Sequence, residues 1–171
     1  MSLPKRKSIR LKEFDYSTPG AYFVTVCTEK RMNLFGTVRN GEIKLSNIGL
    51  IVKNEIENIE KHYPNIKTDK YIIMPNHLHM IIAISEPHFT AGMNPCPTIK
   101  YDIPNVVGKF KAAVTRKVGN AFMHSESSKL WQSSFYDHII RNEKDYLKIW
   151  QYIESNPLVW NPDEFQTNLK D

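Results

Sequence analysis

The 171-residue chain contains only two cysteines, Cys27 and Cys96, and they lie far apart in the sequence. This excludes a disulfide framework and a pair of closely spaced cysteine ligands for zinc. All apolar runs are shorter than the roughly 20 residues of a membrane-spanning helix. Residues 1–14 carry several charges and precede no apolar segment, so no secretory signal is expected. The sequence therefore predicts a protein of the reducing cytoplasm.

A large excess of one charge is also absent, since 23 Lys and Arg residues stand against 18 Asp and Glu. The basic residues nevertheless gather in an N-terminal arm and on one predicted helix that contains no acidic residue. Such clusters suit a polyphosphate partner, because each neutralised phosphate releases counterions. A solvated surface is the alternative interpretation. The candidate DNA-binding residues are Lys5, Arg6, Lys7, Arg10, Lys109, Lys111 and Arg116.

Hydrophobic periodicity predicts five strands and three helices. The strands are expected near residues 20–30, 41–46, 68–74, 77–84 and 133–140, and the helices near 46–61, 106–118 and 142–157. Asn142 is the expected N-cap of the last helix, and Pro157 is expected to end it.

This order of elements favours an α+β fold, specifically a ferredoxin-like (RRM-like) antiparallel sheet with helices packed on one face. A chain of this length is most simply one domain, residues 1–171. It is expected to carry a basic N-terminal arm (1–14), a proline-rich surface loop (85–102) and a C-terminal tail (158–171).

The stretch "YIIMPNHLHMIIAI", residues 71–84, carries two histidines within a hydrophobic strand. Successive side chains of a strand point to opposite faces, so His77 and His79 are expected on one face and Leu78 on the other. Two neutral imidazoles side by side can hold one divalent metal ion. The alternative is that both are exposed residues of a half-solvated strand.

Three blocks of the chain resemble one known family. "YIIMPNHLHMII" resembles the His-hydrophobe-His (HUH) signature of single-tyrosine transposases, in particular REP-associated tyrosine transposases. "RLKEFDYSTPGAYFVTVCT" is similar to the opening segment of that family. "LWQSSFYDHIIRNEKDYLKIWQYIESNP", residues 130–157, is similar to its C-terminal block. The blocks occur in the family's order and cover most of the chain outside the 85–102 loop and the tail.

The resemblance implies a catalytic tyrosine and a metal site. In this family a tyrosine on the C-terminal helix attacks single-stranded DNA and forms a covalent 5′-phosphotyrosine, with a divalent ion held by the HUH histidines. Tyr152 matches the family position four residues before the Asn of the closing Asn-Pro, and Tyr136 is the second candidate. The implied metal ligands are His77, His79 and Asn156, which lies one helical turn after Tyr152. Mg²⁺ and Mn²⁺ are the expected ions.

Two more residues of the C-terminal block are candidate helpers of the site. His138 is first interpreted as a core histidine, with a DNA contact or a role in the site as alternatives. Lys148, one turn before Tyr152, could favour the phenolate, and a solvated surface lysine is the alternative.

The implied partner is single-stranded DNA with a hairpin-forming palindrome, not a membrane, bound by a monomer or a homodimer of a bacterial-type, nucleoid-associated protein. The expected function is a transposase that cleaves and rejoins such DNA. One alternative is a non-catalytic hairpin or single-strand binding protein on the same fold. Another is a metal hydrolase that uses a bound water, although no carboxylate is evidently placed as its general base.

Overall fold

The computed structural model of the chain describes residues 14–86, 101–119 and 129–161. The predicted DNA-binding residues Lys5, Arg6, Lys7 and Arg10 lie outside these ranges. So do most of the predicted 85–102 loop and the tail beyond residue 161. No helix in the described ranges is long and apolar enough to span a membrane.

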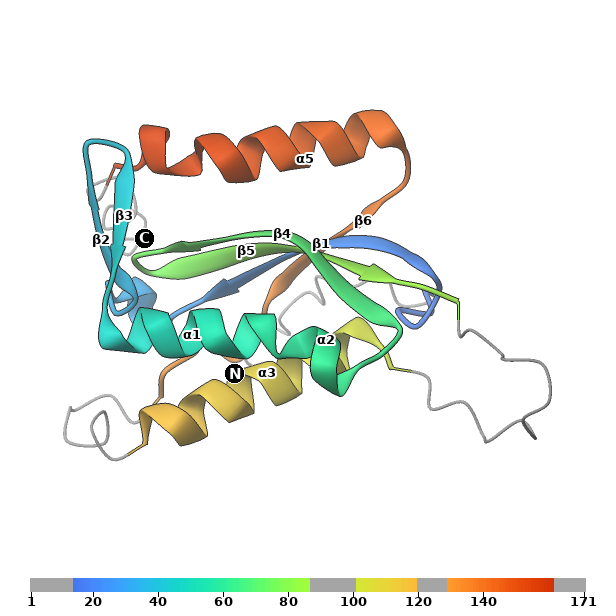
Figure 1. Ribbon diagram of the computed structural model, residues 1–171, viewed down its shortest axis with the longest axis horizontal. Helices are drawn as coiled ribbons and strands as arrows, with labels where there is room; N and C mark the ends of the chain where they lie inside the picture. Colours follow the sequence, from blue (N-terminus) through green and yellow to red (C-terminus); the bar gives the residue numbers. More distant parts are fainter. Residues whose placement is uncertain (1–13, 87–100, 120–128, 162–171) are drawn as a thin grey trace, which may run out of the picture.

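Strands and helices alternate irregularly along the chain (Figure 1). The elements are β1 (Gly20–Cys27), the 3-10 turn η1 (Glu29–Arg31), β2 (Gly36–Arg39), β3 (Glu42–Leu45), α1 (Asn47–Glu57), α2 (Ile59–His62), β4 (Ile66–Met74), β5 (His77–Ile84), α3 (Ile103–Val118), β6 (Tyr136–Ile140), α5 (Glu143–Ser155) and the 3-10 turn η2 (Asn156–Val159).

The main sheet has four strands in the order β4-β5-β1-β6, and all neighbouring strands are antiparallel. This is the strand order of a ferredoxin-like sheet, in which each crossover helix joins two strands that flank a third. The predicted α+β class with an antiparallel sheet is therefore confirmed. β2 and β3 form a separate hairpin whose turn residues Asn40 and Gly41 have φ of 53° and 76°, the left-handed conformation that an Asn-Gly turn favours.

Helices cover both faces of the main sheet, whereas the sequence predicted helices on one face. α1, α2 and α3 lie on one side and α5 on the other (Figure 1). The larger core packs Val24, Leu78 and Met80 against α1 and α3. A smaller core packs Phe23 and Ile81 against Ile149 and Ile153 of α5. The expectation holds for the first three helices and is corrected for the last, whose apolar stripe does not by itself specify a face.

Side-chain caps hold the N-terminal ends of α1 and α5, and the cap predicted at Asn142 is confirmed. Ser46 accepts a hydrogen bond from the backbone N–H of Gly49 at 3.1 Å, and Asn142 accepts one from that of Asp145 at 2.9 Å. Each cap satisfies a donor that the first helical turn leaves without a partner. The helix predicted to run to Lys61 is interrupted at Asn58, between α1 and α2.

Gly49 marks a close approach between α1 and the backbone before β2. A Cβ at this position would meet the carbonyl oxygen of Phe35 well inside van der Waals contact. We expect Gly49→Ala to lower the free energy of unfolding by about 1–3 kcal/mol, the usual effect of overpacking. Urea denaturation followed by circular dichroism measures the change.

Gly108 on α3 provides the matched control, because a Cβ there would meet nothing within 4 Å. Alanine is the better helix former, so Gly108→Ala is expected to raise the free energy of unfolding by up to about 1 kcal/mol. Equal stability of the two variants would contradict the close approach at Gly49.

Candidate active site

A row of polar side chains crosses three strands on the face of the sheet that α5 covers. His77 and His79 alternate with inward-pointing residues of β5. Thr25 on β1 is the register partner of His79, and Cys27 that of His77. Tyr136 on the edge strand β6 is in turn the partner of Thr25. Register partners share a face, so these residues of three distant segments form one surface.

The two histidines converge on a single point. Their Nε2 atoms are 3.1 Å apart. The Nδ1 atom of His77 lies 2.7 Å from the side-chain oxygen of Asn76, and that of His79 lies 2.8 Å from the hydroxyl of Thr25. The prediction that both imidazoles lie on one face is confirmed, but both are buried, so the exposed-strand alternative is wrong.

This arrangement fits a divalent metal ion. Two ligand atoms that are each about 2.1 Å from one ion and about 90° apart are about 3.0 Å from each other. The Asn76 oxygen can only accept, which places the His77 proton on Nδ1 and leaves Nε2 as the ligand atom. The Thr25 hydroxyl can accept from His79 Nδ1 in the same way. Such outer hydrogen bonds are typical of metal-ligating histidines.

The electrostatics of the pair favour neutral imidazoles. Burial, followed by the electrostatic interactions with His79 and with Arg31, lowers the pKa of His77 to about 2. Burial and Arg31 lower the pKa of His79 to about 4. Both rings are therefore neutral at physiological pH, which is the form that binds a metal ion.

Histidine, cysteine and carboxylate side chains alone do not complete a metal site. Across the described residues, no group of three or more His, Cys, Asp and Glu side chains could hold an ion. A third ligand would therefore be of another kind, such as an amide, a tyrosine oxygen, water or a DNA phosphate.

Tyr152 brings its hydroxyl to the same point from α5. The hydroxyl oxygen is 3.4 Å from Nε2 of His79, at the long end of hydrogen bonding. Its ring packs edge-on against Phe23 and against the His79 ring, at centroid distances of 6.1 and 5.2 Å. Ile149 and Ile153 bury the inner side of α5, yet Tyr152 stays 48% exposed. A tyrosine at the edge of the apolar stripe thus reaches both the histidines and solvent.

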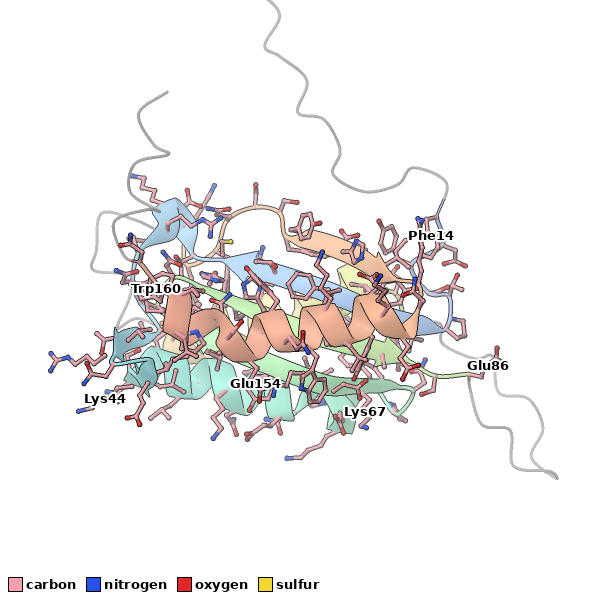
Figure 2. All side chains as sticks on the ribbon, turned by 90° about the horizontal axis from the view of Figure 1, so that it is seen from above. Phe14, Lys44, Lys67, Glu86, Glu154 and Trp160 are labelled. Atoms are coloured by element: carbon pink, nitrogen blue, oxygen red, sulfur yellow. The ribbon has the colours of Figure 1, made fainter. Side chains whose placement is uncertain are left out.

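These groups line an open cleft of about 490 Å³. Its lining residues are Phe23, Thr25, Cys27, Arg31, His77, His79, Gln132, Ser134, Phe135, Tyr136 and Tyr152. α5 lies over the sheet, and Trp160 follows beyond its C-terminal end (Figure 2). The Trp160 ring lies 5.8 Å from that of His77 and so covers this end of the site. Tyr136 is 49% exposed, which makes it a second tyrosine available to a ligand in the cleft.

Three predicted residues are not among the side chains that line the cleft. Asn156 is buried at the junction of α5 and η2. His138 Nε2 is 2.8 Å from a carboxylate oxygen of Asp145, so this pair joins β6 to the first turn of α5. Lys148 is exposed on α5. The pKa of Asp145 is lowered chiefly by its hydrogen bond to His138, and the charge of Lys148 adds to this effect. The structure therefore brings together the two histidines and the two tyrosines of the predicted site.

The basic residues of α3 point in two directions. Lys109 and Arg116 line a separate cavity of about 390 Å³ between α3 and the α1–α2 segment. Lys111 instead donates to the backbone carbonyl of Gln132 at 2.6 Å and helps to hold the segment that borders the cleft. The three basic residues predicted on this helix, Lys109, Lys111 and Arg116, thus have different surroundings, and their DNA binding stays a prediction.

Sequence reasoning missed three residues of the cleft and its surroundings. Asn76 directly precedes His77, so its contact could have been found from the sequence. Thr25 and Arg31 lie about fifty residues away, and only the pairing of β1 with β5 brings them to the histidines.

Comparison with known proteins relates the chain to transposases. An uncharacterised protein of Haemophilus influenzae is 39% identical over 168 residues, covering 93% of this chain and 92% of that protein. A second protein of this organism, named "Putative REP-associated tyrosine transposase", is 25% identical over 144 residues, covering 84% of this chain and 73% of that protein. The chain thus resembles the REP-associated tyrosine transposases.

The fold agrees with this resemblance. A solved REP-associated tyrosine transposase bound to a REP hairpin superposes with a TM-score of 0.61 at 22% identity, covering 87% of this chain and 73% of that chain. No protein-family model matches the chain. These similarities support a function of the transposase type for this chain.

Proposed function

We propose that this chain is a metal-dependent transesterase that cleaves single-stranded DNA next to a hairpin through a covalent 5′-phosphotyrosine at Tyr152. The observation that supports it best is the convergence of three atoms, Nε2 of His77, Nε2 of His79 and the Tyr152 hydroxyl oxygen, in one open cleft. A pair of metal-binding histidines beside a half-exposed tyrosine is the minimal apparatus for phosphoryl transfer to that tyrosine.

The reaction exchanges one phosphodiester bond for another. The Tyr152 oxygen forms a bond to phosphorus, and the bond from phosphorus to the 3′ oxygen breaks. The phenolic proton leaves to solvent and the 3′ oxygen takes up a proton, which gives a 3′-hydroxyl. Because the phosphotyrosine conserves the energy of the broken bond, the reverse attack by a 3′-hydroxyl can rejoin strands without ATP.

The residues around Tyr152 have separate roles in this proposal. His77 and His79 would hold Mg²⁺ or Mn²⁺, with Asn156 as the proposed third ligand. Once bound, the ion would polarise the scissile phosphate as a Lewis acid. Asn76 and Thr25 hold the two imidazole rings by their Nδ1 atoms and so keep both Nε2 atoms directed at the cleft. Phe23 packs against both His79 and Tyr152 and fixes their relative position.

The substrate class follows from the relatives and from the shape of the site. The related protein of known structure is bound to a REP hairpin. The cleft of this chain is open and is lined by the half-exposed ring of Tyr136, on which an unpaired base can stack. A hairpin with a single-stranded flank is therefore the proposed substrate.

The test is a covalent-adduct assay with radiolabelled DNA hairpins that carry single-stranded flanks. In the presence of Mn²⁺ we expect a protein–DNA band that survives denaturing electrophoresis and a released 3′-hydroxyl end. EDTA should abolish the band, and excess Mn²⁺ should restore it. Cleavage that persists in EDTA would contradict the metal role.

Two other outcomes separate the alternatives. Salt-sensitive binding without any adduct in Mn²⁺ would favour the non-catalytic DNA-binding protein. Cleavage that releases both ends without a protein link would favour a hydrolase that uses water.

A further inference from the structure

The cleft beside the histidines contains one permanent charge. Within the described part of the chain, its lining includes a single arginine, Arg31, and no lysine, aspartate or glutamate. The other lining residues are aromatic, hydroxyl, amide, imidazole or thiol groups. A site with one cation and no competing carboxylate favours a ligand that carries negative charge.

Arg31 reaches the cleft from a turn of unusual backbone conformation. Lys30 and Arg31 have φ of 51° and 55°, a left-handed conformation that residues other than glycine rarely adopt. Such a conformation persists only when surrounding contacts enforce it, and it is concentrated at functional sites.

The contacts that enforce this turn connect it to the histidine strand. The backbone N–H of Thr28 donates to the carbonyl of Asn76 at 3.0 Å, and the Thr28 hydroxyl lies 2.9 Å from the same oxygen. The N–H of Arg31 donates to the Thr28 carbonyl at 3.2 Å, and that of Glu29 donates to Leu130 at 3.0 Å. The turn is thereby attached to the residue directly before His77, so Arg31 and the histidines hold a defined relative position.

The charge of Arg31 also acts on the reacting groups. It contributes to the lowered pKa values of His77 and His79 and opposes the rise that burial causes in the pKa of Cys27. Arg31 and these three side chains line the same cleft, so a ligand that occupies the cleft lies beside all four.

We propose that Arg31 is a phosphate-binding residue, whose guanidinium donates to a phosphodiester oxygen of the single strand that lies against His77 and His79. The inference rests on the proposed function only in that DNA occupies this cleft. A guanidinium presents its donors in a planar fork that matches phosphate oxygens, which a lysine does not. Arg31 would hold the strand in the cleft that it shares with Tyr152 and restrain the phosphate next to the Tyr152 hydroxyl.

The experiment measures binding in a protein that cannot cleave. The Tyr152→Phe protein selects a ligand from a pool of random-sequence DNA hairpins with single-stranded flanks. The selected hairpin is then synthesised with one neutral methylphosphonate at each flank position in turn. Affinity for every oligonucleotide is measured with Arg31 present, with Arg31→Ala and with Arg31→Lys.

We expect one flank position at which the neutral group weakens binding about tenfold more than at its neighbours, because a charge-assisted hydrogen bond is lost. In Arg31→Ala the same position should behave like the others, while affinity for unmodified DNA falls about tenfold. Arg31→Lys should recover part of the lost affinity, because lysine keeps the positive charge but lacks the planar set of donors of a guanidinium.

Lys30→Ala is the matched control. Lys30 is exposed on the same turn, has the same backbone conformation and does not line the cleft. Its removal takes away one positive charge, so we expect a small loss shared by all oligonucleotides and no change at the sensitive position.

The outcomes separate this proposal from the proposed function. A sensitive position that persists in Arg31→Ala, or the absence of any sensitive position, overturns the role of Arg31 even if the protein with Tyr152 forms adducts. A second outcome is a sensitive position that disappears in Arg31→Ala, while the protein that retains Tyr152 forms no adduct. This outcome supports the role of Arg31 and overturns the phosphotyrosine reaction. Failure to select any DNA overturns both.

Discussion

Tyr152→Phe is expected to abolish the covalent protein–DNA adduct while DNA binding persists. The substitution removes one oxygen, the atom 3.4 Å from Nε2 of His79, and keeps the ring that packs on Phe23. Loss of a nucleophile typically lowers the rate by about 10⁴-fold or more. Adduct formation on a labelled hairpin, with affinity measured in parallel, tests this expectation.

Tyr136→Phe is the comparison that makes the result specific. Tyr136 lines the same cleft and is equally exposed, but it lies on the edge strand β6 rather than on α5. We expect this variant to keep forming the adduct. If Tyr136→Phe loses the adduct and Tyr152→Phe retains it, the nucleophile is Tyr136.

His79→Ala is expected to remove binding of Mn²⁺ and, with it, adduct formation. Its Nε2 atom is within 3.4 Å of both His77 Nε2 and the Tyr152 hydroxyl, so its loss leaves one imidazole and no bridge to the tyrosine. His77→Ala should have the same effect. Removing a residue that only hydrogen-bonds a metal ligand typically weakens metal affinity by about 10–100-fold. Removing one of the two imidazole ligands should weaken it more. Isothermal titration with Mn²⁺ measures the affinity directly.

His138→Ala controls for the loss of a histidine as such. His138 pairs with Asp145 and does not line the cleft, so we expect unchanged Mn²⁺ affinity and a modest loss of stability. The pair is solvent-accessible, and exposed pairs of this kind contribute about 1 kcal/mol or less. Full Mn²⁺ binding by both His77→Ala and His79→Ala would contradict the proposed metal site.

Much of the site was predictable because it depends on local periodicity. Alternation along a strand places His77 and His79 on one face wherever that strand packs. Helical spacing places Tyr152 at the edge of the stripe formed by Ile149 and Ile153, and Asn142 caps the helix that carries it. These features depend on neighbours in sequence, and the structure confirms them.

Other features depend on which segments meet, and the local pattern does not contain that information. The amphipathic stripe of α5 shows that one side is buried but is compatible with either face of the sheet. The periodicity of α3 did not show that Lys111 and Lys109 have different surroundings. Lys111 donates a hydrogen bond to the Gln132 carbonyl, whereas Lys109 lines the separate cavity. No local sequence pattern indicated that Arg31 belongs to the site, because its turn reaches the cleft through contacts with the distant residues Asn76 and Leu130.

The sequence by itself determined the strands, the helices and the resemblance to REP-associated tyrosine transposases, together with the pair of imidazoles and the helix that carries Tyr152. The tertiary structure alone decided that α5 covers the histidine face and that Tyr152 meets His79 there. It also decided that Thr25, Asn76 and Arg31 surround the histidines. The physical reason is that a side chain's face follows from the backbone period of its own element, whereas its partners follow from strand register and long-range packing.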